Sequence, residues 1–132
     1  MPLKLQLALL SETLAICRLD PGAPIPEWAQ GENFLSISRT TDELSVICSQ
    51  GQVPEGVKKD GGWRCFKVEG TLDVPITGVL AALTTPLAFE GISVFAVSTF
   101  DTDYLLVQKK YLEKAITVLI RSGHHVEYPQ GG

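Results

Sequence analysis

The chain has 132 residues, of which 45% are hydrophobic and 20% charged, and its formal net charge at pH 7 is −4. These values predict a soluble globular protein, built as one compact domain or as two small units that share a core. The negative charge argues against binding to the phosphate backbone of nucleic acid, and no apolar run approaches the roughly 20 residues of a membrane span. We therefore expect neither nucleic acid nor a membrane as a partner.

The first half of the chain consists of short apolar segments separated by turn residues, a pattern typical of strands. Four strands are predicted, at Leu3–Leu10, Leu14–Arg18, Phe34–Thr40 and Leu44–Ser49. One short helix fits around Glu27. Because no second long helix is visible, this half is expected to be at most a degenerate copy of the half that follows.

A glycine-rich segment separates the two halves. Residues 51–62 contain four glycines and one proline and almost no large apolar residue, which predicts a linker. We place the N-terminal half with its linker at residues 1–60 and the C-terminal domain at residues 61–132.

The second half shows alternating strand and helix patterns. They predict a strand at Trp63–Gly70, an apolar helix face at Ile76, Val79, Leu80, Leu83 and Leu87, strands at Ile92–Phe100 and Tyr104–Gln108, a second helix around Leu112–Leu119 and a final strand at His124–Tyr128. The apolar run Ile92–Phe100 suggests a central strand. The order strand, helix, strand, strand, helix, strand is that of the ferredoxin-like α+β fold, with an antiparallel sheet and two helices on one face.

The ends of the first predicted helix carry capping signals. Asp73 suits the N-cap, Pro75 suits the first turn, and Gly91 suits the left-handed residue after the last turn. Gly123 has the same place after the second helix. Pro86 lies inside the first helix, where it should kink or divide the last turns.

Several residues of the second half follow the ACT-domain pattern, in which a strand ends in a loop with Asp and Gly that opens the first helix. They are Val68, Asp73, Gly78, Val79, Leu80, Leu83, Leu87, Gly91 and Ile92. The segments CRLDPGAPIPEW, GWRCFKVEG and PLAFEGISVFAVSTFDTDYLLVQ resemble a tandem-ACT family of bacterial proteins that is related to the animal cytosolic arginine sensors, and together they cover most of the chain. The resemblance implies a noncatalytic regulatory fold whose subunits or repeats pair their sheets side by side, as in a homodimer, and bind small ligands, usually amino acids, at the seam.

An amino acid carries a carboxylate and an ammonium group, so its site needs backbone N–H donors, best supplied at a helix N-terminus, and a carboxylate partner. The loop before the first helix and the turn of the central hairpin offer both. The candidate ligand-binding residues are Asp73, Ile76, Thr77, Gly78, Ser98, Thr99, Phe100, Asp101 and Asp103. Asp103 is the preferred ammonium partner, although Asp73, Asp101 and Thr102 also fit purely structural roles in a cap and a turn. No other carboxylate lies in the first helical turn, which argues against arginine itself as the ligand.

Enzymatic interpretations find little support in the sequence, and no catalytic residue is assigned. A Cys65–histidine pair would form only if the strand carrying His124 and His125 lay beside Trp63–Gly70. An acylphosphatase-like hydrolase needs an arginine in a phosphate-binding loop and a helper asparagine, whereas Arg64 lies on a predicted strand and Asn33 in the other half. The other alternative is an interaction module without a ligand.

The three cysteines, Cys17, Cys48 and Cys65, show no CxxC spacing and no neighbouring histidine. We predict neither a disulfide framework nor a metal site, but buried, reduced thiols in a cytoplasmic protein. Nucleotide-binding and zinc-protease motifs are missing from the sequence, so no cofactor is expected.

Overall fold

The computed structural model describes residues 3–31, 33–69 and 78–129. The chain folds into two compact units, one formed by the described residues up to Ser11 and from Arg64 onward, the other by Glu12–Trp63. In the long strand β5 (Lys58–Glu69), residues 58–63 belong to the unit Glu12–Trp63 and residues 64–69 belong to the other unit. We call the unit Glu12–Trp63 the small unit, and we call the other, which contains both α-helices, the helical unit.

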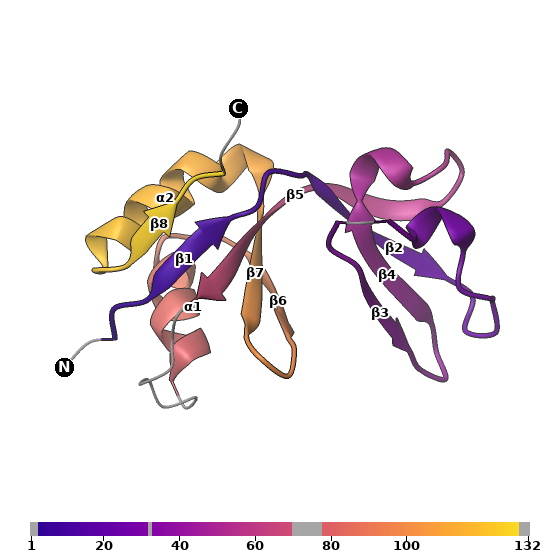
Figure 1. Cartoon of the computed structure of the whole chain (residues 1–132), viewed down its shortest axis with the longest axis horizontal. Helices are drawn as coiled ribbons and strands as arrows, with labels where there is room; N and C mark the ends of the chain where they lie inside the picture. Colours follow the sequence, from indigo (N-terminus) through magenta and orange to yellow (C-terminus); the bar gives the residue numbers. More distant parts are fainter. Residues whose placement is uncertain (1–2, 32, 70–77, 130–132) are drawn as a thin grey trace. The chain divides into compact units, whose positions relative to one another are not determined.

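The small unit is an antiparallel sheet with two short 3-10 turns (Figure 1). Its strands are β2 (Leu14–Leu19), β3 (Ser36–Arg39), β4 (Leu44–Ser49) and the start of β5, in the order β3-β4-β2-β5. The turns are η1 (Glu27–Ala29), which confirms the short helix expected near Glu27, and η2 (Gln50–Gln52). A small core of buried side chains lies on one face of this sheet, and it includes Cys17, Leu44, Val46 and Cys48.

The linker predicted over residues 51–62 is wrong for its last five residues, because β5 already begins at Lys58. The pairing of β5 with β2 shifts by one residue opposite Gly62, whose φ of 77° is left-handed. The Gly62 N–H donates to Gln50 Oε1 at 2.6 Å. The two adjacent glycines therefore form a β-bulge within a strand, a use of glycine that composition does not distinguish from a flexible linker.

The helical unit contains five strands and two helices among its described residues. They are β1 (Gln6–Leu9), the second half of β5, α1 (Val79–Phe89), β6 (Val94–Ser98), β7 (Asp103–Gln108), α2 (Leu112–Arg121) with its preceding turn η3 (Lys109–Tyr111), and β8 (His125–Glu127). Both helices pack on one face of the sheet, in a core that includes Leu7, Phe66, Leu83, Leu105 and Leu119. The predicted α+β fold and its element order are confirmed.

The strand order, β8-β1-β5-β7-β6, departs from the sequence-based picture in two places. β1 was assigned to the N-terminal half, but it lies between β5 and β8, antiparallel to the first and parallel to the second. β6 was expected in a central position, but among the strands that the structure describes it pairs with β7 alone. Hydrophobic patterning reports which side chains are apolar and says nothing about how many strands lie alongside, so neither placement followed from it.

The two helices end in the same way. At the end of α1, Gly91 has a φ of 75°, the Gly91 N–H donates to the Ala88 carbonyl, and the Ile92 N–H donates to the Leu87 carbonyl. Gly123, with a φ of 100°, makes the equivalent bonds after α2. Both are Schellman motifs, so the two glycine signals read from the sequence are confirmed.

The start of α1 and its proline differ from expectation. Gly78, with a φ of 94°, occupies the N-cap position that was assigned to Asp73, and Asp73 and Pro75 lie outside the described residues. The helix continues through Pro86 to Phe89, so the proline does not divide it.

Candidate functional site at the hairpin end of the sheet

The candidate site lies where three parts of the helical unit meet at one end of its sheet (Figure 1). β5 ends there at Glu69, α1 begins there at Val79, and the turn between β6 and β7 closes there. The hydroxyl of Thr102 donates to the carbonyl of Val68, which ties the turn to the end of β5.

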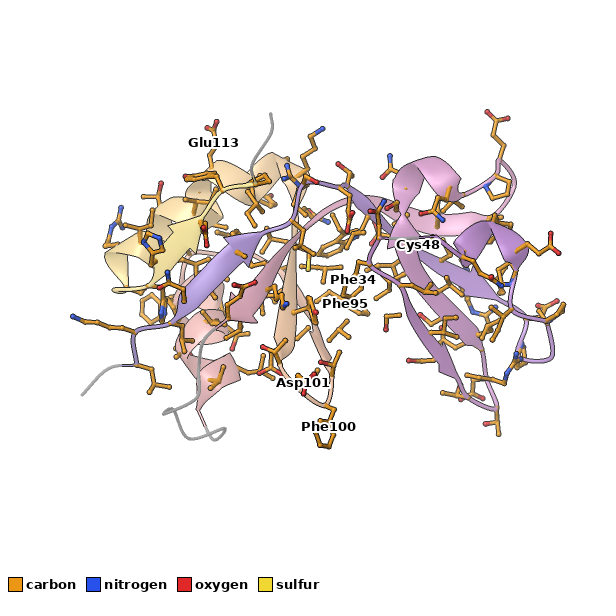
Figure 2. All side chains as sticks on the ribbon, in the orientation of Figure 1. Phe34, Cys48, Phe95, Phe100, Asp101 and Glu113 are labelled. Atoms are coloured by element: carbon orange, nitrogen blue, oxygen red, sulfur yellow. The ribbon has the colours of Figure 1, made fainter. Side chains whose placement is uncertain are left out.

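The turn itself is held by threonine side chains. The Thr99 N–H donates to the Thr102 carbonyl at 2.8 Å, and the Thr102 N–H donates to the Thr99 hydroxyl at 3.3 Å. The four loop residues 99–102 are thus closed by the Thr99 hydroxyl. A hydrogen bond from a turn side chain to the local backbone is one of the structural roles expected for the residues of this turn. The hydroxyl of Thr99 is therefore engaged within the turn, whereas Phe100 and Asp101 are exposed at its tip, as Figure 2 shows.

Ser98 and Asp103 lie directly opposite one another in the hairpin register. Two and four residues further along β7, Leu105 and Val107 belong to the core beneath the helices. Because side chains alternate along a strand, Asp103 is on that same helix-covered face, at the end where α1 begins. Asp103 is half-buried, and no ion pair joins it to the residues that the structure describes.

The beginning of α1 supplies hydrogen-bond donors at this end. The first backbone bond of the helix joins the Ala82 N–H to the Gly78 carbonyl at 2.9 Å. The N–H groups of the preceding helical residues thus have no acceptor within the helix, and the helix dipole makes this end attractive to an anion. Of the candidates from the sequence, Gly78, Ser98, Thr99, Phe100, Asp101 and Asp103 are placed here, while Asp73, Ile76 and Thr77 lie outside the described residues.

A second feature, which the sequence reasoning missed, is a hollow of about 500 Å³ at the other end of α1. It is lined by Thr84 and Ala88 of α1, by Gly91 and Ile92 after the helix, and by Val94 and Ala96 of β6. We call it the α1–β6 groove. A signal for it was present in the sequence, because the segment 78–100 contains a single charged residue, Glu90.

Residues 58–121 match the family model of the ACT domain, and residues 12–56 match the model of a family described as an N-terminal domain. A crystal structure of a protein from Agobacterium tumefaciens is 40% identical, with 98% of this chain and 96% of that chain covered and a TM-score of 0.94. The chain belongs to the ACT-domain protein family. The resemblance read from the sequence is thereby confirmed.

More distant structures share the fold of this ACT protein. A Vibrio cholerae protein of unknown function, described as a possible transport protein, is 17% identical, with a TM-score of 0.76 and 91% of each chain covered. The ligand-free regulatory subunit of aspartate kinase from Thermus thermophilus is 11% identical, with a TM-score of 0.62, and the match covers 88% of this chain and 96% of that chain. Among proteins of curated function, none matches the chain.

The arrangement of this ACT protein gives no support to a Cys65–histidine pair. β8 lies beside β1 rather than beside β5, so the condition for that pair is not met. Arg64 is on β5, where its Nη2 donates to the Leu10 carbonyl, and Asn33 of the small unit donates to Ser49 Oγ. Across the described ranges, no cluster of three or more His, Cys, Asp or Glu side chains is arranged to hold a metal ion. None of the helices in the same ranges is long and apolar enough to cross a membrane.

His124 has a structural role that the sequence did not reveal. Pro86 has no N–H to offer the Ala82 carbonyl one turn earlier, and His124 Nε2 lies 3.3 Å from that oxygen. The Leu5 N–H donates to His124 Nδ1 at 3.1 Å, so the neutral ring joins the residue before β1 to α1. Burial lowers the pKa of His124, which favours this neutral form.

The three thiols are free and buried, as predicted. Burial, followed by the neighbouring Cys48, raises the pKa of Cys17 to about 11, and burial also raises the pKa of Cys48. Both thiols are therefore protonated at neutral pH and poorly nucleophilic.

Proposed function

We propose that this ACT protein is a noncatalytic regulator that acts in the cytoplasm as a homodimer and binds a small ligand, an amino acid, at the hairpin end of its sheet. The observation that carries the proposal is Asp103, a half-buried carboxylate opposite Ser98, on the helix-covered face at the end where α1 begins. The regulatory subunit of aspartate kinase, which shares the fold, is consistent with a regulatory role.

The two ends of an amino acid find complementary groups here. Its ammonium group would bind the Asp103 carboxylate and the Ser98 hydroxyl, because a charged donor and a carboxylate form the stronger kind of hydrogen bond. Its carboxylate would accept hydrogen bonds from the first N–H groups of α1, next to Gly78, which has no side chain to obstruct the approach. Asp101 and Phe100 at the turn, and Asp73, Ile76 and Thr77 before the helix, are the proposed contacts of the ligand's side chain.

A thermal-shift screen of the twenty amino acids tests the proposal directly. A ligand at 100 times its dissociation constant should stabilise the protein by about 2.7 kcal/mol, which is a shift of several degrees for a domain of this size. Asp103→Asn should remove most of that shift while leaving the melting temperature without ligand nearly unchanged, because a half-exposed carboxylate that makes no ion pair with the described residues contributes little to folding.

Glu113→Gln is the matched control, since Glu113 is an exposed carboxylate on α2, away from the hairpin (Figure 2). It should keep the full ligand-induced shift. If no amino acid moves the melting temperature, the ligand proposal fails, and the interaction module without a ligand becomes the better account.

A further inference from the structure

A second hollow lies in the small unit, on the sheet formed by β2, β4 and the start of β5. Its volume is about 210 Å³, and the residues that line it belong to Glu12–Trp63. Cys17 and Lys59, a register pair on the core side of the sheet, are two of them. The other lining residues occupy alternate positions, so their side chains share the opposite face of the sheet: Ile16, Arg18, Glu43, Ser45, Lys58 and Asp60. We call this feature the β2–β5 hollow.

Two cations face each other in the β2–β5 hollow. Arg18 and Lys58 are directly opposite in antiparallel register, and Ser45 of β4 lies on the other side of Arg18. Like charges directly opposite each other destabilise a sheet. Neither cation makes an ion pair with the residues that the structure describes, and the Arg18 Nη2 donates to the Asp42 carbonyl at 3.0 Å, which holds the guanidinium without neutralising it. An anion above this row would relieve the repulsion and accept charge-assisted hydrogen bonds.

The remaining side chains of the hollow limit which anion fits. Ile16, half-buried on the same face, gives an apolar surface beside the two cations. Glu43 and Asp60 also line the hollow, and their negative charges oppose a dianion such as phosphate. The volume is below the roughly 300 Å³ at which pockets for drug-sized ligands begin. These features select a small molecule with one negative charge and a short apolar body.

The geometry points to a binding site for a small monocarboxylate in the β2–β5 hollow. Arg18, Lys58 and the Ser45 hydroxyl hold the carboxylate, and the apolar body lies on Ile16. The planar fork of a guanidinium suits the two oxygens of a carboxylate. This site goes beyond the proposed amino-acid site, which lies in the helical unit, and does not depend on it. Arg18 and Lys58 are distant in the sequence, and the pairing of β2 with β5 brings them together.

Isovalerate is a suitable probe, because it joins one carboxylate to a branched apolar body. It is titrated into the isotope-labelled full chain at constant ionic strength, and the amide chemical shifts are followed by NMR. Saturable shifts are expected for the amides of β2 and of the start of β5. Isovaleramide, which has the same shape without the charge, should cause none. Inorganic phosphate should bind more weakly than isovalerate.

Lys58→Gln and Lys59→Gln are matched variants, since neighbouring residues of a strand face opposite sides of the sheet. Lys58→Gln should raise the isovalerate dissociation constant about tenfold, because it removes a charged hydrogen-bond donor, whereas Lys59→Gln should leave it nearly unchanged. Lys58→Gln should not lower the melting temperature measured without isovalerate, because it also removes the repulsion with Arg18. A purely structural role for Lys58 would instead lower that temperature and leave the affinity unchanged.

Three results overturn the monocarboxylate site. They are the absence of saturable shifts with isovalerate, equal shifts with isovaleramide, and equal effects of Lys58→Gln and Lys59→Gln on the affinity. Phosphate that binds more tightly than isovalerate would rule out a monocarboxylate as the ligand. Asp103→Asn at the hairpin should leave the isovalerate titration unchanged, so this site and the proposed amino-acid site can fail separately. The NMR spectrum of each variant verifies that it is folded.

Discussion

The two helices of the helical unit lie on the same face of the same sheet and end in the same glycine motif, but their outer surfaces differ. α2 buries Ala115, Ile116 and Leu119 and carries exposed charges on its other side, including Glu113 and Lys114. α1 buries Val79, Leu83 and Leu87 and carries no charge on any side. The outer side of α2 therefore has the charges typical of a helix surface that faces water, whereas the outer side of α1 has none.

The largest expected effect is the loss of unfolding free energy when a core leucine is replaced, and it should be equal in the two helices. Leu83 of α1 and Leu119 of α2 are both fully buried in one core. Replacing either by Ala removes apolar contacts and leaves a cavity, so each should lower the free energy of unfolding by about 2–5 kcal/mol, measured by urea denaturation. A much smaller loss for Leu83→Ala than for Leu119→Ala would contradict the equal packing of the two helices against this core.

The next largest loss of stability is expected at His124, whose ring bonds to Ala82 of α1 and to Leu5, the residue before β1. His124→Leu leaves the Leu5 N–H and the Ala82 carbonyl without their partner, and it should cost about 2 kcal/mol or more of unfolding free energy. His125→Leu, at the exposed neighbouring position, is the control and should cost much less. Equal losses would contradict the role assigned to the buried ring.

The same histidine predicts a pH dependence. Burial lowers the pKa of His124 in the folded state, so below the ordinary value of 6.5 the unfolded chain binds a proton that the folded chain does not. The His124 contribution to stability is therefore fully present above that pH and is lost as the pH falls through the folded pKa. Unfolding free energies measured between neutral and mildly acid pH should decline for the unmodified protein and decline less for His124→Leu.

A smaller effect tests whether the two helix ends are equivalent. Gly91 and Gly123 both have positive φ, and an added Cβ meets nothing within 4 Å at Gly91 and only the Lys4 side chain, at 3.7 Å or more, at Gly123. Replacement of either by Ala should therefore cost about 1–2 kcal/mol through backbone strain alone. Melting temperatures that differ strongly between the two variants would show that one end does more than close its helix.

The smallest effect on folding gives the sharpest contrast between the outer surfaces. Ala88→Lys on α1 and Thr117→Lys on α2 both place a cation at an exposed helical position. Each should change the unfolding free energy of the monomer by less than about 0.5 kcal/mol. In sedimentation experiments we expect only Ala88→Lys to weaken the proposed homodimer, because it places a charge on the uncharged outer side of α1. Equal behaviour of the two variants would remove the distinction between the surfaces.

Part of the candidate site could be read from the sequence, and part could not. The hairpin between β6 and β7 was predicted from a short turn between two apolar runs, but the strand was expected to continue to Phe100, and the register that sets Ser98 opposite Asp103 came from the structure. The α1–β6 groove was missed because it depends on the distance between a helix and an edge strand. That distance is set by packing, and the strand pattern alone had suggested a central position for β6.

The sequence by itself determined the order of the elements, the family and the C-terminal ends of both helices, and those helix ends depend on neighbours within a few residues. Gly91 and Gly123 terminate helices through bonds to carbonyls in the preceding turn. The tertiary structure alone decided that β1 lies between β5 and β8, that Gly62 forms a bulge, and that His124 bonds to the carbonyl left free by Pro86. These contacts join residues far apart in the chain, and periodicity along a sequence carries no information about which distant backbone groups meet.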